Sequence, residues 1–151
     1  MTEFSNLDTV SSTITIASLS SLGSASYSAP STLVDNTVAG NAKSYLRGWV
    51  RLSFSAALTA GTGSPYIVLY AHQARDGSTN PTPPGTGATA PSPNALQVIV
   101  QLNASATFQV IDFPPIDLDP FKYAFQIQNV SGVAFSGTAT LTLYRGDVQG
   151  I

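Results

Sequence analysis

Hydrophobic and polar residues alternate along most of this chain with a period of two, which is the period of a β-strand rather than of a helix. Near the C-terminus, Ala139, Leu141 and Leu143 share one face, whereas Tyr144 and the intervening threonines share the other. Residues 96–102 and 121–128 alternate in the same way. Such stretches are typical of antiparallel strands that pack one face on a core and expose the other.

Residues 45–54 form a longer candidate strand of the same kind. The pattern places one set of side chains on one face (Leu46, Val50, Leu52 and Phe54) and a second set on the other (Tyr45, Arg47, Trp49 and Arg51). Residues 66–71 are instead apolar on both sides, which predicts a central strand covered on both faces. Weaker candidate strands cover residues 13–16, 25–29 and 108–111.

Together these segments predict an all-β fold: a single antiparallel β-sandwich of about eight strands. Gly132, in the turn at residues 129–132, indicates a hairpin between the last two strands. The sandwich domain is expected to cover residues 13–151, since no composition shift divides this range into two units.

Two segments lack the alternation. Residues 1–12 are polar and predict a flexible N-terminal arm ahead of the domain. Residues 76–94 hold five of the ten prolines and three of the twelve glycines, and they are far longer than an ordinary strand connection. Because proline and glycine suppress regular structure, this loop is expected to project as an irregular, partly polyproline segment.

Composition narrows the function classes. Charged residues make up only 9% of the chain, and hydroxyl groups take their place in 19 serines and 16 threonines. With six Lys and Arg residues and a net charge of −2, a basic nucleic-acid binder is excluded. A weakly charged surface gives little repulsion between copies, so we expect a homo-oligomer or a component of an assembly. The chain has no cysteine, no leader pattern and no apolar run of bilayer length, so we expect no disulfide, no export by the standard route and no membrane partner.

Trp49, between Arg47 and Arg51, is the strongest candidate for a binding residue. An exposed tryptophan beside arginines has the composition of a protein interface. The same residues could form a platform for a sugar or a peptide, or could pack within the chain. The sequence favours an interface over a sugar site.

Acidic residues and a lone histidine complete the candidates. Asp112, Asp117 and Asp119 could act as an acid–base pair or bind calcium, but the prolines around them favour solvated acids in a stiff turn. His72 follows the 66–71 strand and is expected to be a partly exposed structural residue. No catalytic signature is present, so we expect neither an enzyme nor a cofactor or metal.

Several short motifs follow one another in a fixed order between residues 18 and 145. They are residues 18–27 (SLSSLGSASY), 34–36 (VDN), 45–49 (YLRGW), 66–70 (YIVLY), 76–77 (DG), Ile116 ahead of Phe121 and Lys122, 127–132 (IQNVSG) and 141–145 (LTLYR). Their order and spacing resemble those of small virion structural proteins of tailed bacteriophages, of the head cement or decoration type. The chain departs from that family in its longer Pro/Gly loop and in the few charges along its outer strands.

The resemblance implies a β-sandwich of jelly-roll type that is made in the host cytoplasm and present in many copies on the capsid surface. Its implied role is that of a cement protein, which binds and stabilises the shell of the major capsid protein. The arm, the long loop and the tryptophan face are the expected contact regions, with Phe4, Arg47, Trp49, Arg51, Pro83 and Pro84 as candidate contact residues.

Two other functions stay open at this point. A receptor- or carbohydrate-binding module of a head fibre or tail would expose coplanar aromatic rings from among Trp49, Tyr66 and Tyr70. A hydrolase would use the carboxylates at 112, 117 and 119, although nothing in the sequence indicates what would separate their pKa values.

Overall fold

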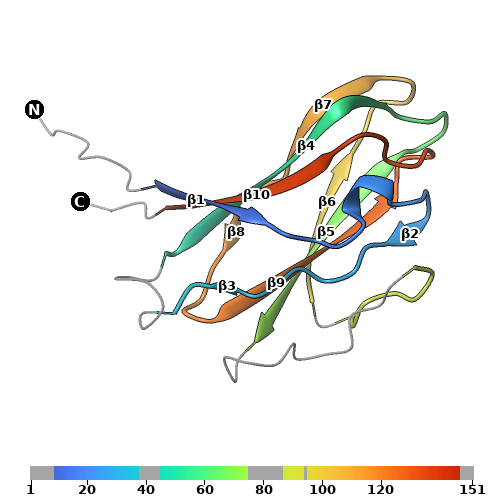
Figure 1. Ribbon diagram of the computed structural model, residues 1–151. Coiled ribbons are helices and arrows are strands. Elements are labelled where there is room, and N and C mark those ends of the chain that lie inside the picture. The colour runs from blue at the N-terminus through green and yellow to red at the C-terminus, as the bar shows by residue number, and fades with distance from the viewer. Residues whose placement is uncertain (1–8, 38–44, 75–86, 94, 147–151) are drawn as a thin grey trace, which may run out of the picture.

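The computed structural model describes residues 9–37, 45–74, 87–93 and 95–146, and its regular elements are almost all β-strands (Figure 1). The strands are β1 (Thr9–Ile14), β2 (Ser26–Tyr27), β3 (Val34–Asp35), β4 (Arg47–Thr59), β5 (Tyr66–Ala74), β6 (Leu96–Gln101), β7 (Thr107–Asp112), β8 (Ile116–Asp117), β9 (Lys122–Val130) and β10 (Ala139–Gly146). One turn of 3-10 helix, η1 (Leu19–Ser21), follows β1. Within the described ranges, no helix is long and apolar enough to cross a membrane.

Two antiparallel sheets of five strands each form the molecule, and we call them sheet A and sheet B. Sheet A has the order β1-β10-β4-β7, with β8 also paired with β4. Sheet B has the order β2-β9-β5-β6, with β3 also paired with β9. The predicted antiparallel β-sandwich is therefore confirmed.

The strand order is that of an eight-stranded jelly roll in which two strands are interrupted. Arg47 in β4 lies opposite Gly146 of β10 on one side and opposite Asp117 of β8 on the other, so β8 continues the row of β7. In the same way, β3 continues the row of β2 along β9. The interruptions fall at Pro114 and Pro115 and at Pro30, because proline has no N–H to donate to a ladder.

The hydrophobic core lies between the sheets and is made by alternate residues of each strand. Leu52 of β4, Leu141 of β10 and Phe125 of β9 are fully buried in it. The faces predicted for β10 are therefore confirmed. Strand β9 is instead buried on both faces, because Ala124 and Gln126, predicted on its exposed face, are fully buried. In residues 45–54 the predicted alternation holds only from Arg47, where β4 begins. Tyr45 is buried and Leu46 is 64% exposed, which is the reverse of the prediction. These two residues precede the strand, so its alternation does not set the direction of their side chains.

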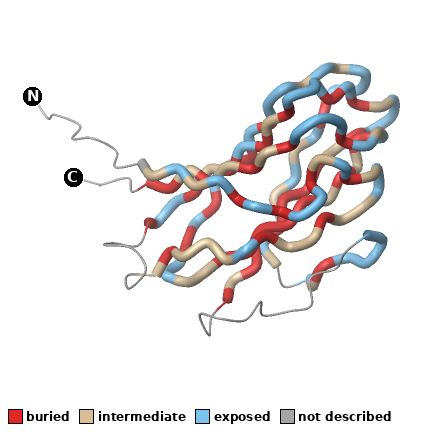
Figure 2. The backbone as a smooth tube through the Cα atoms, viewed as in Figure 1, coloured by how far each residue is buried: buried red, intermediate tan, exposed pale blue. Residues whose placement is uncertain are grey.

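Strand β5 is covered on both faces, as its sequence predicts. Ile67 and Leu69 face sheet A, whereas Val68 and Tyr70 are buried on the opposite side of sheet B. The described part of the long loop lies on that opposite side, as Figure 1 and Figure 2 show.

Gly87 anchors this part of the loop at one edge of sheet B. Its N–H donates to the carbonyl of Tyr27 and its own carbonyl accepts from the Tyr27 N–H, at 3.0 and 2.7 Å. Pro91 is buried, and the chain then enters β6 at the other edge of the sheet. The prediction of a projecting loop is therefore wrong at Gly87, which is bonded to β2, and at Pro91, which is buried, while residues 88–90 are exposed. Residues 75–86 lie outside the described residues.

Two boundary predictions also need correction. Strand β1 begins at Thr9 and pairs with β10, so residues 9–12 belong to a strand and not to an arm; residues 1–8 lie outside the described residues. The turn at 129–132 does not close a hairpin, because β9 belongs to sheet B and β10 to sheet A. Buried Asn129 shapes this crossing by donating to the carbonyls of Leu22 and Val133 and accepting from the Ser131 N–H.

Candidate functional site

The outer face of sheet A carries the residues that the sequence singled out on β4. Because Val50 and Leu52 point into the core, the pleat sends Arg47, Trp49 and Arg51 to the opposite side. Both arginines are exposed and the tryptophan is half-buried. The predicted grouping of these three residues on one face is therefore confirmed.

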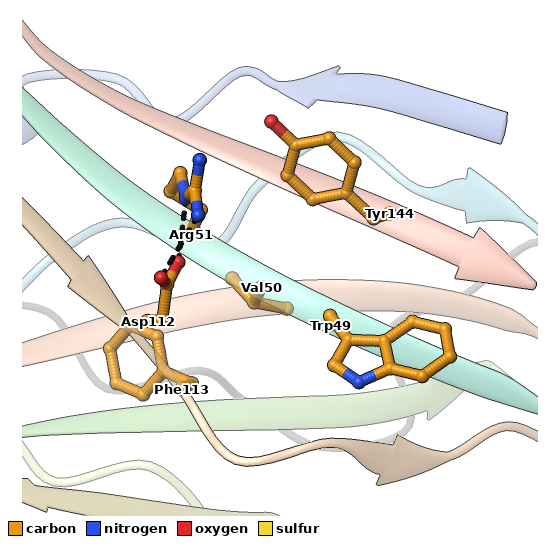
Figure 3. Close-up of a pocket in the computed structure, with 6 residues that line it drawn as sticks. All are labelled: Trp49, Val50, Arg51, Asp112, Phe113 and Tyr144. Atoms are coloured by element: carbon orange, nitrogen blue, oxygen red, sulfur yellow. Dashed lines mark hydrogen bonds and ion pairs between the residues drawn. The ribbon is translucent and has the colours of Figure 1, made fainter. Parts of the chain in front are cut away.

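Neighbouring strands add two side chains to this face. Tyr144 of β10 lies directly opposite Trp49, and Asp112 of β7 lies directly opposite Arg51. With Val50 and Phe113 at its base, this set lines an open depression of about 390 Å³ (Figure 3). We call Trp49, Arg51, Asp112 and Tyr144 the Trp49 cluster.

An ion pair fixes one side of the Trp49 cluster. Arg51 donates from Nε to Asp112 Oδ1 at 2.6 Å and from Nη2 to Oδ2 at 2.9 Å, the two-point geometry that guanidinium and carboxylate groups favour. The Arg51 guanidinium also lies 5.8 Å from the centre of the Tyr144 ring. The two hydrogen bonds from Arg51 thus fix the orientation of the Asp112 carboxylate, and they lower the pKa of this carboxyl group.

The charges of the two arginines that flank Trp49 are balanced by acidic partners. Arg47 pairs with Asp117 of β8, with Nε 3.5 Å from Oδ1. Both arginines of β4 therefore have an aspartate on the adjacent row of sheet A. Sequence reasoning missed this pairing and the role of Tyr144, because the strand register that brings them together cannot be read from a single strand.

The three aspartates do not form one site. Asp112 and Asp117 bind different arginines, while Asp119 accepts from Gln73 Nε2 at 2.9 Å. The Asp119 main chain is held in a turn, since its N–H donates to Tyr123 Oη and its carbonyl accepts from the Phe121 N–H. The described ranges contain no group of three or more histidine, cysteine or acidic residues placed to hold a metal ion.

His72 lies on the covered face of sheet B, and the expectation of a partly exposed edge residue is wrong. It belongs to the central strand β5, is 3% exposed and lies 3.2 Å from Gln126 Oε1 through its Nε2. Burial lowers the pKa of His72, against a smaller opposing effect of the Gln126 hydrogen bond. The imidazole thus packs within this covered face.

The aromatic platform expected of a sugar-binding module does not form from the predicted rings. Trp49 lies on sheet A, whereas Tyr66 and Tyr70 belong to β5 of sheet B. Tyr70 is 6% exposed and donates to Gln128 Oε1 at 3.0 Å, and burial raises its pKa to about 12. The ring that does accompany Trp49 is Tyr144.

The remaining contact candidates, Phe4, Pro83 and Pro84, lie outside the described residues and stay predictions. No family model matches the chain, and neither a search of curated proteins nor a search of solved structures finds a match. What bears on function is therefore the jelly-roll fold, the Trp49 cluster and the order of motifs along the sequence.

Proposed function

We propose that this chain is a structural protein of a tailed-bacteriophage virion: a capsid cement or decoration protein that binds the major capsid protein through the Trp49 cluster. The observation that carries the proposal is a difference between the two outer faces of the sandwich. The outer face of sheet B buries Val68, Tyr70 and His72, while the outer face of sheet A leaves a tryptophan, a tyrosine and a paired arginine open.

The composition of the cluster suits a protein contact. Tryptophan, tyrosine and arginine are the residues most enriched among those that dominate binding energy at interfaces. The two hydrogen bonds to Asp112 already orient the Arg51 guanidinium, so binding would cost less side-chain entropy there than at a mobile arginine. The hydroxyl side chains around it, such as Thr140 and Thr142, present no large charge that a neighbouring subunit would have to match.

Copy number would supply the rest of the affinity. A capsid lattice repeats one binding site many times, so contacts of modest strength add up when a decoration protein is itself linked to its neighbours. The motif order set out above points to the same class of proteins. This role requires no reaction from the chain.

Receptor or carbohydrate binding is the second candidate. Its support is the 390 Å³ depression itself, which lies within the range of small-ligand sites and combines aromatic rings with a guanidinium and a carboxylate. A glycan array probed with the wild-type protein and with Trp49→Ala tests it. Glycan binding that disappears in the variant would support this function, and an array without signal would remove it.

The experiment that tests the cement role compares phage particles with and without the protein. We expect particles that lack it to lose their shell at lower temperature and on transfer to low ionic strength. Adding back wild-type protein should restore both properties, and adding back Trp49→Ala should not. Thr62→Ala, in the exposed turn after β4 and outside the Trp49 cluster, is the matched control and should act as wild type.

Two results would contradict the proposal. Particles that are equally stable with and without the protein would argue against a cement role. A Trp49→Ala variant that decorates particles at wild-type occupancy would remove the Trp49 cluster from the contact.

A further inference from the structure

Strand β6 forms an edge of sheet B whose outward backbone groups can be assigned. Within the described residues β6 pairs only with β5, and the Leu102 N–H donates to the Pro65 carbonyl in the same register. Because hydrogen-bonded and non-bonded pairs alternate in an antiparallel ladder, Val98 and Val100 turn their backbone groups toward β5. The N–H and C=O groups of Gln97, Ile99 and Gln101 therefore point away from the sheet.

This edge lacks the features that keep other edges from pairing. Natural edge strands are protected by charges, prolines, bulges or short length. At the β7 edge of sheet A, the register with β4 shifts between Ser53 and Leu58, and the strand ends in the charged Asp112. At the other edge of sheet B, β2 and β3 are short, with two residues each. The opposite edge of sheet A, β1, is also six residues without charge or proline, but its exposed side chains are the hydroxyls of Ser11 and Thr13 and not a large apolar residue. Strand β6 has six continuous residues without charge or proline, and Ile99 is 58% exposed on it.

The sequence of this edge is a palindrome. Residues 97–101 read Gln-Val-Ile-Val-Gln in both directions. Two antiparallel copies centred on Ile99 place each residue opposite its own kind: glutamine on glutamine, valine on valine and isoleucine on isoleucine. The three outward-facing pairs would each exchange two N–H···O=C bonds, because Ile99 and both glutamines turn these groups to the edge.

We propose that β6 is a homodimer interface, in which a second copy of this chain pairs antiparallel with it across a two-fold axis at Ile99. Such an interface is self-complementary, as a two-fold dimer requires. It joins two copies of sheet B into one continuous sheet and covers both exposed Ile99 side chains. Half-buried Val98 and Val100, which pack at the margin of the core, would gain a partner from the other copy. The proposal does not depend on the phage assignment, because it uses the β6 edge and not the Trp49 cluster.

Disulfide trapping tests both the interface and its register, since the chain has no cysteine of its own. Residues opposite one another in a hydrogen-bonded antiparallel pair have Cα atoms about 5.5 Å apart, within the range that a disulfide spans. Under mild oxidation, Ile99→Cys should form a covalent dimer at least tenfold faster than the control Val110→Cys, which replaces another exposed apolar residue on β7.

Two further variants define the register. Gln97→Cys alone and Gln101→Cys alone should form covalent dimers no faster than the control, whereas an equimolar mixture of the two should do so. Rapid self-linking of Gln97→Cys would indicate a parallel or shifted arrangement and would overturn the proposal. Equal rates for Ile99→Cys and Val110→Cys would also overturn it.

Sedimentation provides an independent measure without cysteine. The wild-type protein should approach twice the chain mass of 15.7 kDa as its concentration rises, and Ile99→Lys, which brings two like charges together at the axis, should remain at the single mass. Ile99→Pro removes only an N–H that points away from β5 and should have the same effect. A wild-type protein that stays at the single mass throughout, or variants that dimerise as wild type does, would refute the interface.

Discussion

The two outer faces of the sandwich carry similar side chains in opposite environments. On sheet B, Tyr70 and His72 are 6% and 3% exposed and each is bonded to a glutamine of β9. On sheet A, Trp49 and Tyr144 are half-buried beside an exposed ion pair. On sheet B, the Tyr27 ring lies 6.1 Å from the Tyr70 ring, Tyr27 is bonded to Gly87 of the loop between β5 and β6, and Gln126 donates to the Ser28 carbonyl. On sheet A, the Trp49 cluster lines an open depression instead.

This comparison shows that residue type alone does not identify a functional site. A buried tyrosine or histidine contributes to stability, and its polar atoms are already used within the chain. The same types of group on the open face keep their surfaces available to a partner. The four predictions below test this distinction, and they run from the largest expected effect to the smallest.

Equivalent charge insertions on the two faces should have very different costs. Val68→Asp puts a carboxylate at a site that is 3% exposed, and we expect it to lower the free energy of unfolding by about 3 kcal/mol or more. Thr142→Asp, on the open face opposite Arg51, should change it by less than about 0.5 kcal/mol. Urea unfolding of both variants measures this difference, and equal costs would mean that this face of sheet B is not buried in solution.

Removing one aromatic ring from each face gives the second contrast. Tyr70→Ala empties a buried site and leaves Gln128 Oε1 without its donor, so it should cost about 3 kcal/mol. Trp49→Ala removes a half-buried ring and should cost about 1 kcal/mol or less, although it abolishes binding under the proposed function. Thermal unfolding of the two variants provides the comparison, and a larger loss for Trp49→Ala would place that ring in the core rather than in a binding face.

The covered face should also make stability depend on pH. Burial lowers the pKa of His72 in the folded state, so the unfolded chain binds a proton first as the pH falls. Stability should therefore decrease as the pH falls below about 6.5, by at most about 1.4 kcal/mol per pH unit, until the folded-state pKa is reached. His72→Gln should abolish this slope between pH 7 and pH 5, and a slope that persists would have to come from another group.

The sequence predicts the sandwich well, because alternation is a local property of each strand. The Ala139, Leu141, Leu143 face and the two-sided burial of residues 66–71 follow directly from side-chain order. The crossing at 129–132 does not, since a glycine indicates where the chain turns and not which sheet it enters next. The loop is a similar case: its prolines predict irregular backbone, but they do not predict that Gly87 bonds to Tyr27 or that Pro91 is buried.

The Trp49 cluster is predictable only in part for the same physical reason. Arg47, Trp49 and Arg51 share one strand, so a period of two places them on one face. Tyr144 and Asp112 reach the cluster through cross-strand register, which depends on how β10 and β7 align with β4. His72 was misjudged because the end of an apolar run does not mark the end of a strand: β5 continues to Ala74.

The smallest expected effect concerns the Arg51–Asp112 pair, and it separates orientation from stability on the open face. Both side chains are exposed, at 44% and 60%, so solvent screens their attraction. A double-mutant cycle with Arg51→Met and Asp112→Asn should give a coupling energy of only about 0.2–1 kcal/mol, which decreases as salt is added. Because the pKa of Asp112 is lowered in the folded state, this contribution is present above about pH 4 and is lost as the pH falls through the folded-state value. A coupling energy of several kcal/mol that does not decrease with salt would instead show that the pair is shielded from water. The outer face of sheet A would then not be an open face, and the contrast with sheet B would be wrong.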